Sequence, residues 1–123
     1  MVDTSSTPKD GENTWLWLIK IISGLTLIII LFIHLYVNHL LAPEGLLDFN
    51  GVIAYFQNPI VPIMEGTFLV FVVVHSLLGL RAIILDLNPS RKAMVVWNSL
   101  LTVFGLSAIV YGIWLLTSIV AQG

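Results

Sequence analysis

Three long runs of apolar residues divide the chain, and short polar segments separate them. The runs cover about residues 15–41, 60–87 and 93–120. Each run exceeds the roughly 20 helical residues that cross the hydrocarbon core of a bilayer, and none shows the alternation that is typical of a membrane β-barrel strand. Because backbone groups in lipid must form hydrogen bonds within the protein, the runs predict helices. We expect an all-α membrane protein with three transmembrane helices.

The polar segments predict how these helices are connected. Residues 1–14 form a polar tail without the features of a signal or transit peptide. Residues 42–59 mix Gly, Pro, Asn and Asp with apolar residues, which predicts a loop that can include a short interfacial helix. Residues 88–92 form a tight turn, so the second and third helices should be adjacent and antiparallel. Residues 15–120 are expected to form a single membrane domain.

The basic residues predict the orientation of the helices. All of them lie in the tail, near the start of the first helix, or around the turn between the second and third: Lys9, Lys20, Arg81, Arg91 and Lys92. The segment 42–59 contains no Lys or Arg. Because basic residues are enriched on the cytoplasmic side, we place the N-terminus and residues 88–92 in the cytoplasm. The long loop and the C-terminus are expected outside.

The composition agrees with a membrane location and excludes several kinds of chemistry. Of the 123 residues, 58% are hydrophobic and 10% are charged, which is more apolar surface than a soluble domain of this size can bury. The net charge of −2 offers no basic face for nucleic acid. The chain has no cysteine, so it cannot supply thiolate ligands to a metal or an iron–sulfur cluster.

The most informative polar residue within the apolar runs is His75. It lies about 12 residues from the cytoplasmic end of the second helix, about 18 Å deep at 1.5 Å per residue. A buried neutral imidazole needs a partner for its donor and for its acceptor nitrogen. Gly79 and Ala82 share its helix face and leave room for a flat macrocycle or for a neighbouring helix. The residues alone leave two interpretations open, a hydrogen bond between helices and an iron ligand.

Two charged residues follow His75 on its cytoplasmic side. Arg81 and Asp86 lie where the propionates of a haem that is bound edge-on would reach the interface. Arg81 could equally extend its guanidinium to the lipid headgroups.

The first helix carries the other two histidines. His34 lies in its outer half, with Ser23 on the same stripe and Lys20 near it. His39 lies near the outer interface, where a solvated side chain is expected. From the cytoplasmic edge, His34 is about 27 Å deep and His75 about 18 Å. This difference of about 9 Å argues against one shared iron. It fits two haems, each completed by a histidine from another subunit.

The second helix also carries a motif that resembles a known family. The run His75-Ser-Leu-Leu-Gly79-Leu-Arg81-Ala-Ile-Ile-Leu-Asp86 resembles the H-x-x-x-G-x-R-x-x-x-x-D segment of succinate dehydrogenase membrane anchors. Two further runs are similar to segments of the family's first helix: Ile22-Ser23-Gly24-Leu25 and His34-Leu-Tyr-Val-Asn38-His39. The resemblance covers about residues 15–120. It implies that His75 ligates haem b, and that His34 ligates a second haem.

The resemblance also implies a role within a larger complex, in a bacterial or archaeal cell membrane. A flavoprotein subunit oxidises succinate, an iron–sulfur subunit carries the electrons, and two membrane anchors bind haem and quinone. The chain would be one non-catalytic anchor that passes electrons to a quinone near the cytoplasmic side. The expected cofactor contacts, besides the two histidines, are Arg81, Lys20, Ser23 and Asp86. Lys20 is a candidate for the quinone or for a haem propionate.

The sequence departs from the family at the quinone site. Trp17 and Ile21 stand where one family anchor has a Ser and an Arg, and Leu87 stands where the other has a Tyr. We therefore expect the partner chains to supply most quinone contacts.

Two alternative functions come from other interpretations of the polar residues. One is a small multidrug-type transporter or a purely structural membrane subunit, with Glu65 as the coupling carboxylate of the transporter. Such transporters usually have four helices and a glutamate in the first, whereas Glu65 lies near the start of the second helix. The other is a cytochrome b subunit of a different respiratory enzyme.

Overall fold

All regular structure in the part of the chain that the structure describes is helical. The computed structural model describes residues 12–40 and 47–123. The elements are α1 (Thr14–Leu35), a π-helical continuation η1 (Tyr36–Leu40), α2 (Phe49–Phe56), α3 (Ile60–Asp86) and α4 (Arg91–Val120). Among these residues, three helices are long and apolar enough to cross a membrane: Thr14–Leu40, Ile60–Asp86 and Arg91–Val120. The predicted all-α class with three spans is confirmed.

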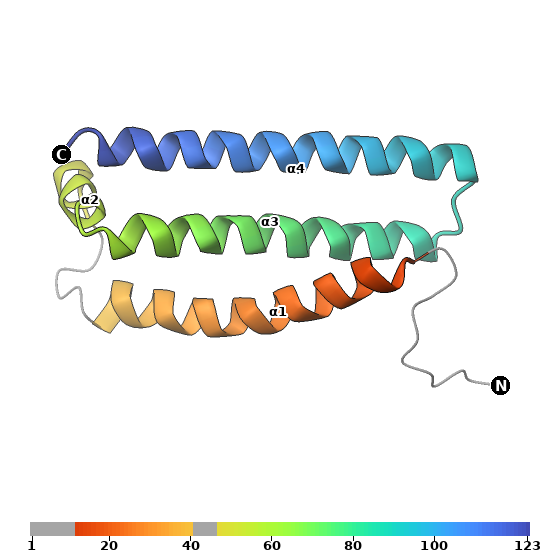
Figure 1. The fold of residues 1–123 in the computed structure, drawn as a ribbon, viewed down its shortest axis with the longest axis horizontal. Coiled ribbons are helices and arrows are strands. Elements are labelled where there is room, and N and C mark those ends of the chain that lie inside the picture. Colours follow the sequence, from red (N-terminus) through yellow and green to blue (C-terminus); the bar gives the residue numbers. More distant parts are fainter. Residues whose placement is uncertain (1–11, 41–46) are drawn as a thin grey trace.

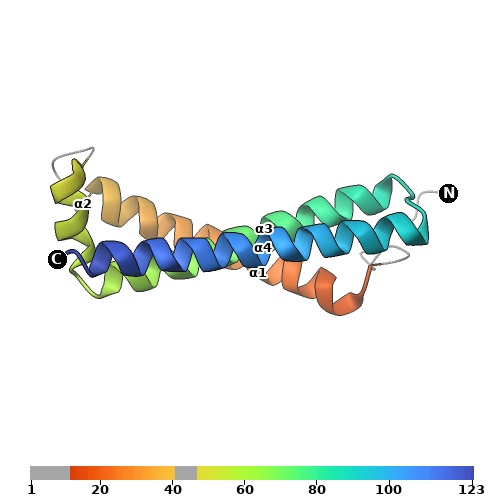
Figure 2. The same cartoon turned by 90° about the horizontal axis from the view of Figure 1, so that it is seen from above.

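The three long helices form a single layer with α3 in the centre (Figure 1). α3 contacts α1 on one side and α4 on the other, and the described parts of α1 and α4 do not contact each other. From above, α1 crosses the other two helices at an angle (Figure 2). A single layer leaves apolar side chains open, such as Phe32 on α1 at 71% exposure and Phe104 on α4 at 66%. These faces suit contact with lipid or with another membrane chain.

Side-chain caps fix where the long helices begin. The side chain of Asn13 accepts a hydrogen bond from the backbone N–H of Trp15 at 2.9 Å, as an N-cap residue does. Ser90 caps α4 in the same way through the N–H of Ala93 at 3.1 Å, so α4 begins two residues earlier than predicted. After α3, Asn88 adopts the left-handed conformation with φ of 51°, which ends the helix. The predicted antiparallel pairing of the last two helices is confirmed.

The short helix α2 lies across one end of the layer (Figure 1). Asp48 caps it by accepting from the N–H of Gly51 at 2.7 Å. At its other end, the amide of Gln57 donates to the carbonyl of Val120 at 3.2 Å, which joins α2 to the end of α4. The predicted helix within the long loop is therefore present. Predictions for residues 1–11 and 41–46 lie outside the described residues, and the side of the membrane on which each end lies stays a prediction.

Small residues bring α3 and α4 close together. Gly105 is buried, and a Cβ added there would lie 2.6 Å from Cδ1 of Leu77. A Cβ on Gly112 would overlap several atoms of the Leu69 side chain. These contacts show that small residues of α4 form a helix-packing face.

We expect the substitution Gly112→Ala to lower the free energy of unfolding by about 1–3 kcal/mol, because it overpacks the contact with Leu69. The matched control is Gly66→Ala, whose Cβ would lie at an ordinary 3.5 Å from Leu116. Both variants gain the same helix propensity, so their difference isolates the packing. Thermal unfolding of the complex in detergent measures it, and equal midpoints for the two variants would contradict this packing.

Candidate functional site

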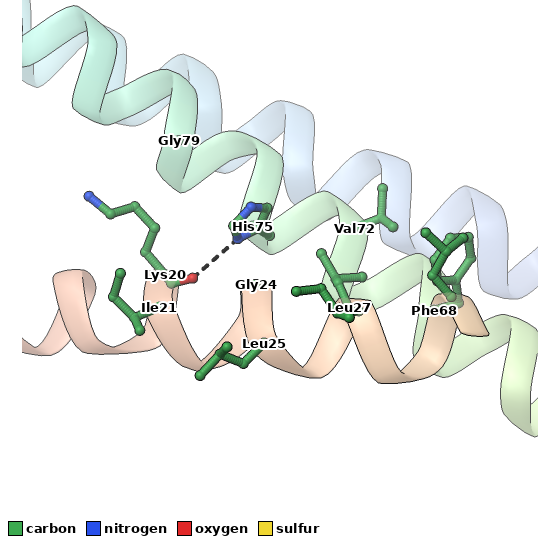
Figure 3. A pocket seen from close by; sticks show the side chains of 11 residues that line it. Lys20, Ile21, Gly24, Leu25, Leu27, Phe68, Val72, His75 and Gly79 are labelled. Atoms are coloured by element: carbon green, nitrogen blue, oxygen red, sulfur yellow. Dashed lines mark hydrogen bonds between the residues drawn. The ribbon is translucent and has the colours of Figure 1, made fainter. Parts of the chain in front are cut away.

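A cavity of about 830 Å³ lies between α1 and α3 (Figure 3). His75 of α3 and Lys20 of α1 are its only ionisable lining residues among the described part of the chain. The other lining residues are glycines and apolar side chains: Ile21, Gly24, Leu25, Leu27, Ile28, Leu31, Phe68, Val72 and Gly79. The cavity is open to one face of the helix layer. Its size and lining suit a largely apolar cofactor with a few polar groups.

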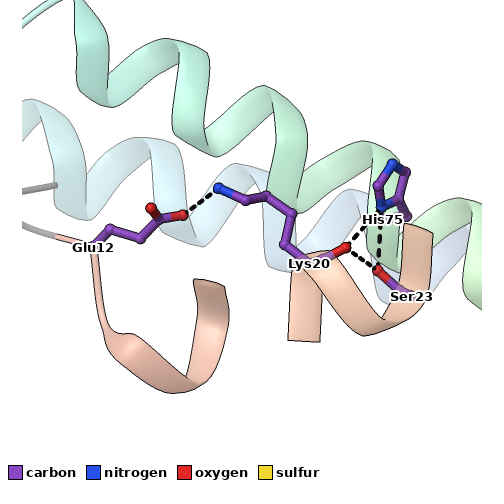
Figure 4. A network of polar contacts seen from close by, with 4 residues as sticks. All are labelled: Glu12, Lys20, Ser23 and His75. Atoms are coloured by element: carbon purple, nitrogen blue, oxygen red, sulfur yellow. Dashed lines mark hydrogen bonds and ion pairs between the residues drawn. The ribbon is translucent and has the colours of Figure 1, made fainter. Parts of the chain in front are cut away.

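The ring of His75 is held through Nδ1 by two groups of α1 (Figure 4). Nδ1 lies 3.2 Å from the carbonyl oxygen of Lys20 and 3.1 Å from Oγ of Ser23. The Ser23 hydroxyl itself donates to the same carbonyl at 2.9 Å. Because a carbonyl only accepts hydrogen bonds, its contact with Nδ1 favours the tautomer with the proton on Nδ1. In that tautomer the acceptor lone pair of the neutral ring lies on Nε2.

This arrangement prepares His75 to act as a metal ligand. Within residues 12–40 and 47–123, Nε2 has no hydrogen-bond partner, and the ring lines the cavity. Metal-binding histidines commonly donate their second N–H to a carbonyl or a carboxylate, which fixes the tautomer. The two interpretations that the sequence left open are therefore compatible, because Nδ1 joins the helices while Nε2 stays available.

Two small residues of α1 make room for the ring. Ser23 is 2% exposed and lies beneath the imidazole. A Cβ added to Gly24 would lie 2.9 Å from Cε1 of His75, closer than real side chains approach. Sequence reasoning did not include Gly24 among the site residues, although the Ser-Gly pair of the first helix was the signal that could have identified it.

A cation lies at the edge of the same cavity. The Nζ atom of Lys20 lies 2.6 Å from Oε1 of Glu12, and the two side chains are 19% and 8% exposed. Lys20 is the only cation that lines the cavity within the described residues. It is therefore placed to meet an anionic group of a bound cofactor, and Glu12 is a partner that the sequence did not predict.

Two of the predicted site residues lie away from the cavity. Nε of Arg81 donates to Oδ1 of Asn98 on α4 at 2.9 Å, so it is directed to the opposite neighbour of α3. Asp86 is the last residue of α3 and does not line the cavity. The cofactor contacts expected of these two residues stay predictions.

His34 lies at a different level of the same helix pair. Its Nδ1 is 3.3 Å from Oε1 of Glu65, and its ring stacks on Phe68 with centroids 5.1 Å apart. These partners precede His75 on α3 by 7 to 10 residues, which is about 10 to 15 Å along the helix. The structure thus keeps the two histidines apart, as the predicted depths required. His39 lies in η1 and is exposed.

The donor set suits a haem better than a metal ion bound by protein alone. The described residues contain no group of three or more His, Cys, Asp or Glu side chains that could hold a metal ion. A haem iron needs only axial ligands from the protein, because the macrocycle supplies the rest. One histidine beside an apolar cavity, with a cation at its edge, meets that need.

Comparisons with known proteins identify the family. The family model of the succinate dehydrogenase/fumarate reductase transmembrane subunit matches residues 4–115. The chain is 33% identical to a succinate dehydrogenase hydrophobic membrane anchor subunit of Archaeoglobus fulgidus, over 84% of this chain and 87% of that protein. It is 32% identical to the succinate dehydrogenase 2 membrane subunit SdhC of Mycobacterium tuberculosis, over 72% of this chain and 67% of that protein.

These matches confirm the resemblance that the motif of the second helix indicated, and they favour neither the transporter nor a different respiratory enzyme. The chain belongs to the succinate dehydrogenase/fumarate reductase transmembrane subunits, and it is a multi-pass membrane anchor of such a complex.

Proposed function

We propose that this anchor binds haem b through Nε2 of His75, in the cavity between α1 and α3. One observation carries the proposal: Nδ1 of His75 lies 3.2 Å from the Lys20 carbonyl, and the ring lines an apolar cavity of about 830 Å³. When bound, the haem supplies one-electron redox chemistry between an iron–sulfur subunit and a quinone.

The residues of this chain hold and insulate that group. The carbonyl of Lys20 and the hydroxyl of Ser23 orient the imidazole. The apolar walls contributed by α1 and α3 exclude water, which is one of the factors that set a haem potential. A haem propionate is a carboxylate, as the side chain of Glu12 is. The ammonium of Lys20 would therefore bind the propionate in place of Glu12, or bind both carboxylates.

The single layer of helices supports a role for a second anchor. The cavity opens to one face, and His75 is the only histidine that lines it within the described residues. A second protein ligand to the haem would then come from another membrane chain that covers this face. We propose the second anchor as that chain, with the flavoprotein and the iron–sulfur subunit bound on the side of Lys20.

Quinone reduction is proposed at the same end of the bundle. Lys20 and Asp86 lie there, toward the N-terminus of α1 and the C-terminus of α3 (Figure 1). Ser23 is buried beneath His75, so its role is to hold the histidine rather than to contact quinone. Most quinone contacts are assigned to the partner chains.

A second haem is proposed at His34. The two histidines lie on different helices, at levels about 10 to 15 Å apart, and this separation is too large for one iron. The purified complex should therefore contain two b haems per bound flavin. The haem is quantified as its pyridine haemochrome, and the flavin by its absorbance. A value of one haem per flavin would remove His34 from the ligand set, and the absence of a b-type band would overturn the proposed function.

A cavity-filling substitution tests the location of the first haem. A Cβ on Gly79 meets no atom within 4 Å, so this position opens into the cavity. We expect Gly79→Leu to assemble but to lose the haem at His75, because the larger side chain occupies its space. Gly79→Ala is the milder control, and haem content is again the readout. A full haem complement in Gly79→Leu would place the haem elsewhere.

A further inference from the structure

We propose that Glu65 is the positioning residue for His34: its carboxylate accepts Nδ1–H and thereby presents Nε2 to the outer haem iron. The inference rests on the proposed function, in which His34 binds that haem. It adds a role for Glu65, which neither the motif nor the family matches assign.

The contact geometry places the carboxylate at Nδ1. Oε1 of Glu65 lies 3.3 Å from Nδ1 of His34, and the side chains are 19% and 26% exposed. Nδ1 is buried and makes no hydrogen bond with a described residue. The terminal torsion of a Glu side chain is broad, so rotating the carboxylate can complete the bond without moving α3. The stacked ring of Phe68 restricts the imidazole on one face.

A tyrosine of α2 lies near Glu65. The buried hydroxyl of Tyr55 on α2 makes no hydrogen bond with a described residue. Burial and the nearby Glu65 carboxylate raise the pKa of Tyr55, and the amide of Asn38 opposes this. Tyr55 therefore keeps its proton and can donate to the carboxylate. Asn38 in turn donates to the carbonyl of His34 at 2.9 Å.

Each of the two histidines thus has an oxygen acceptor beside Nδ1, and the two acceptors differ in charge. Nδ1 of His75 meets a neutral carbonyl of α1, whereas Nδ1 of His34 meets an anionic side chain of α3. An anionic acceptor makes the imidazole a stronger donor to the metal, which favours the ferric over the ferrous state. Glu65 should therefore lower the potential of the outer haem specifically.

Redox titration of the intact complex with Glu65→Gln tests this assignment. The Gln variant keeps the shape and an acceptor oxygen but removes the charge. We expect the ratio of reduced to oxidised outer haem at a fixed ambient potential to rise about tenfold, which is about 59 mV for one electron. The haem at His75 should be unchanged. His34→Leu identifies which signal belongs to the outer haem.

A nearby polar residue provides the matched control. Thr67→Val removes a hydroxyl of α3 that donates to the carbonyl of Ile63 at 2.7 Å. Thr67 lies about 200° around α3 from Glu65, so neither potential should move. If both haems are present and Glu65→Gln leaves the outer potential unchanged, the role of Glu65 is wrong and the haem assignment stands. If His34→Leu removes no haem, the assignment of His34 is wrong, and the inference fails with it.

A second variant covers the case in which the Gln variant does not assemble. Glu65→Asp keeps the charge but shortens the side chain by one methylene, which withdraws the carboxylate from Nδ1 of His34. We expect the same direction of change in the outer haem, and an unchanged outer potential in this variant would overturn the role of Glu65.

Discussion

The variant His75→Leu is expected to assemble and to lose completely one of the two b-type haems proposed above. Leucine has no lone pair for the iron, and the macrocycle alone does not hold the haem in an open cavity. The hydroxyl of Ser23 still donates to the Lys20 carbonyl at 2.9 Å, so the end of α1 that packs on α3 keeps a satisfied hydrogen bond. The reduced-minus-oxidised spectrum of the purified complex measures the loss.

The control for this variant is another histidine of the same chain. His39 is exposed in η1, and no contact of its side chain supports the cavity. His39→Leu should keep both haems. An assembled His75→Leu complex with a spectrum identical to that of the parent would show that the iron has other ligands.

The substitution Gly24→Ala is expected to have the second-largest effect. Its Cβ would lie 2.9 Å from Cε1 of His75, and a planar ring can only avoid it by moving as a whole. The movement breaks the contact of Nδ1 with the Lys20 carbonyl. Loss of such an orienting partner typically weakens metal binding about 10- to 100-fold. Haem content after purification, and the rate of haem loss to a haem scavenger, measure the effect.

A change in helix propensity cannot account for the predicted loss of haem. Replacing Gly by Ala in a helix interior favours the helix by about 1 kcal/mol, which is the opposite direction. Gly66→Ala provides the comparison, because its Cβ makes only ordinary contacts at 3.5 Å and beyond. If Gly24→Ala keeps haem as firmly as Gly66→Ala does, the ring of His75 does not rest on α1 as described.

Much of the fold follows from local signals in the sequence. Each span is a long apolar run, and lipid leaves the backbone no alternative to a helix at these lengths. The tight turn at residues 88–92 predicted the pairing of α3 with α4. The boundary of α4 differed by two residues, since the cap formed by Ser90 depends on its side-chain rotamer as well as on its residue type.

The details of the site depend on the register between helices, that is, on which residues of α1 and α3 lie at the same level. The sequence alone does not predict this register. The partner of His75 is the carbonyl of Lys20, a backbone group that no residue type reveals. The contact of His34 with Glu65 joins residues of α1 and α3 whose relative level is set by packing. The direction of Arg81 could have been predicted from the sequence. Arg81 follows His75 by six residues, and at 100° per residue this places it about 240° around the helix from His75. That angle already separates it from the face of the cavity.

The single layer was also beyond local reasoning. Nothing in the three runs indicates which helix lies in the centre, because the apolar residues are spread around each one. In the structure α3 takes that place, and the cavity beside it stays open to one face. This openness is the reason for proposing that a partner chain completes the site.

A cryo-electron microscopy map of the assembled complex tests the central claim most directly. We predict planar haem density in the cavity between α1 and α3, with the iron bonded to Nε2 of His75 and a second axial ligand from a neighbouring chain. A map in which lipid or quinone occupies this cavity, with Nε2 of His75 not bonded to a metal, would contradict the account.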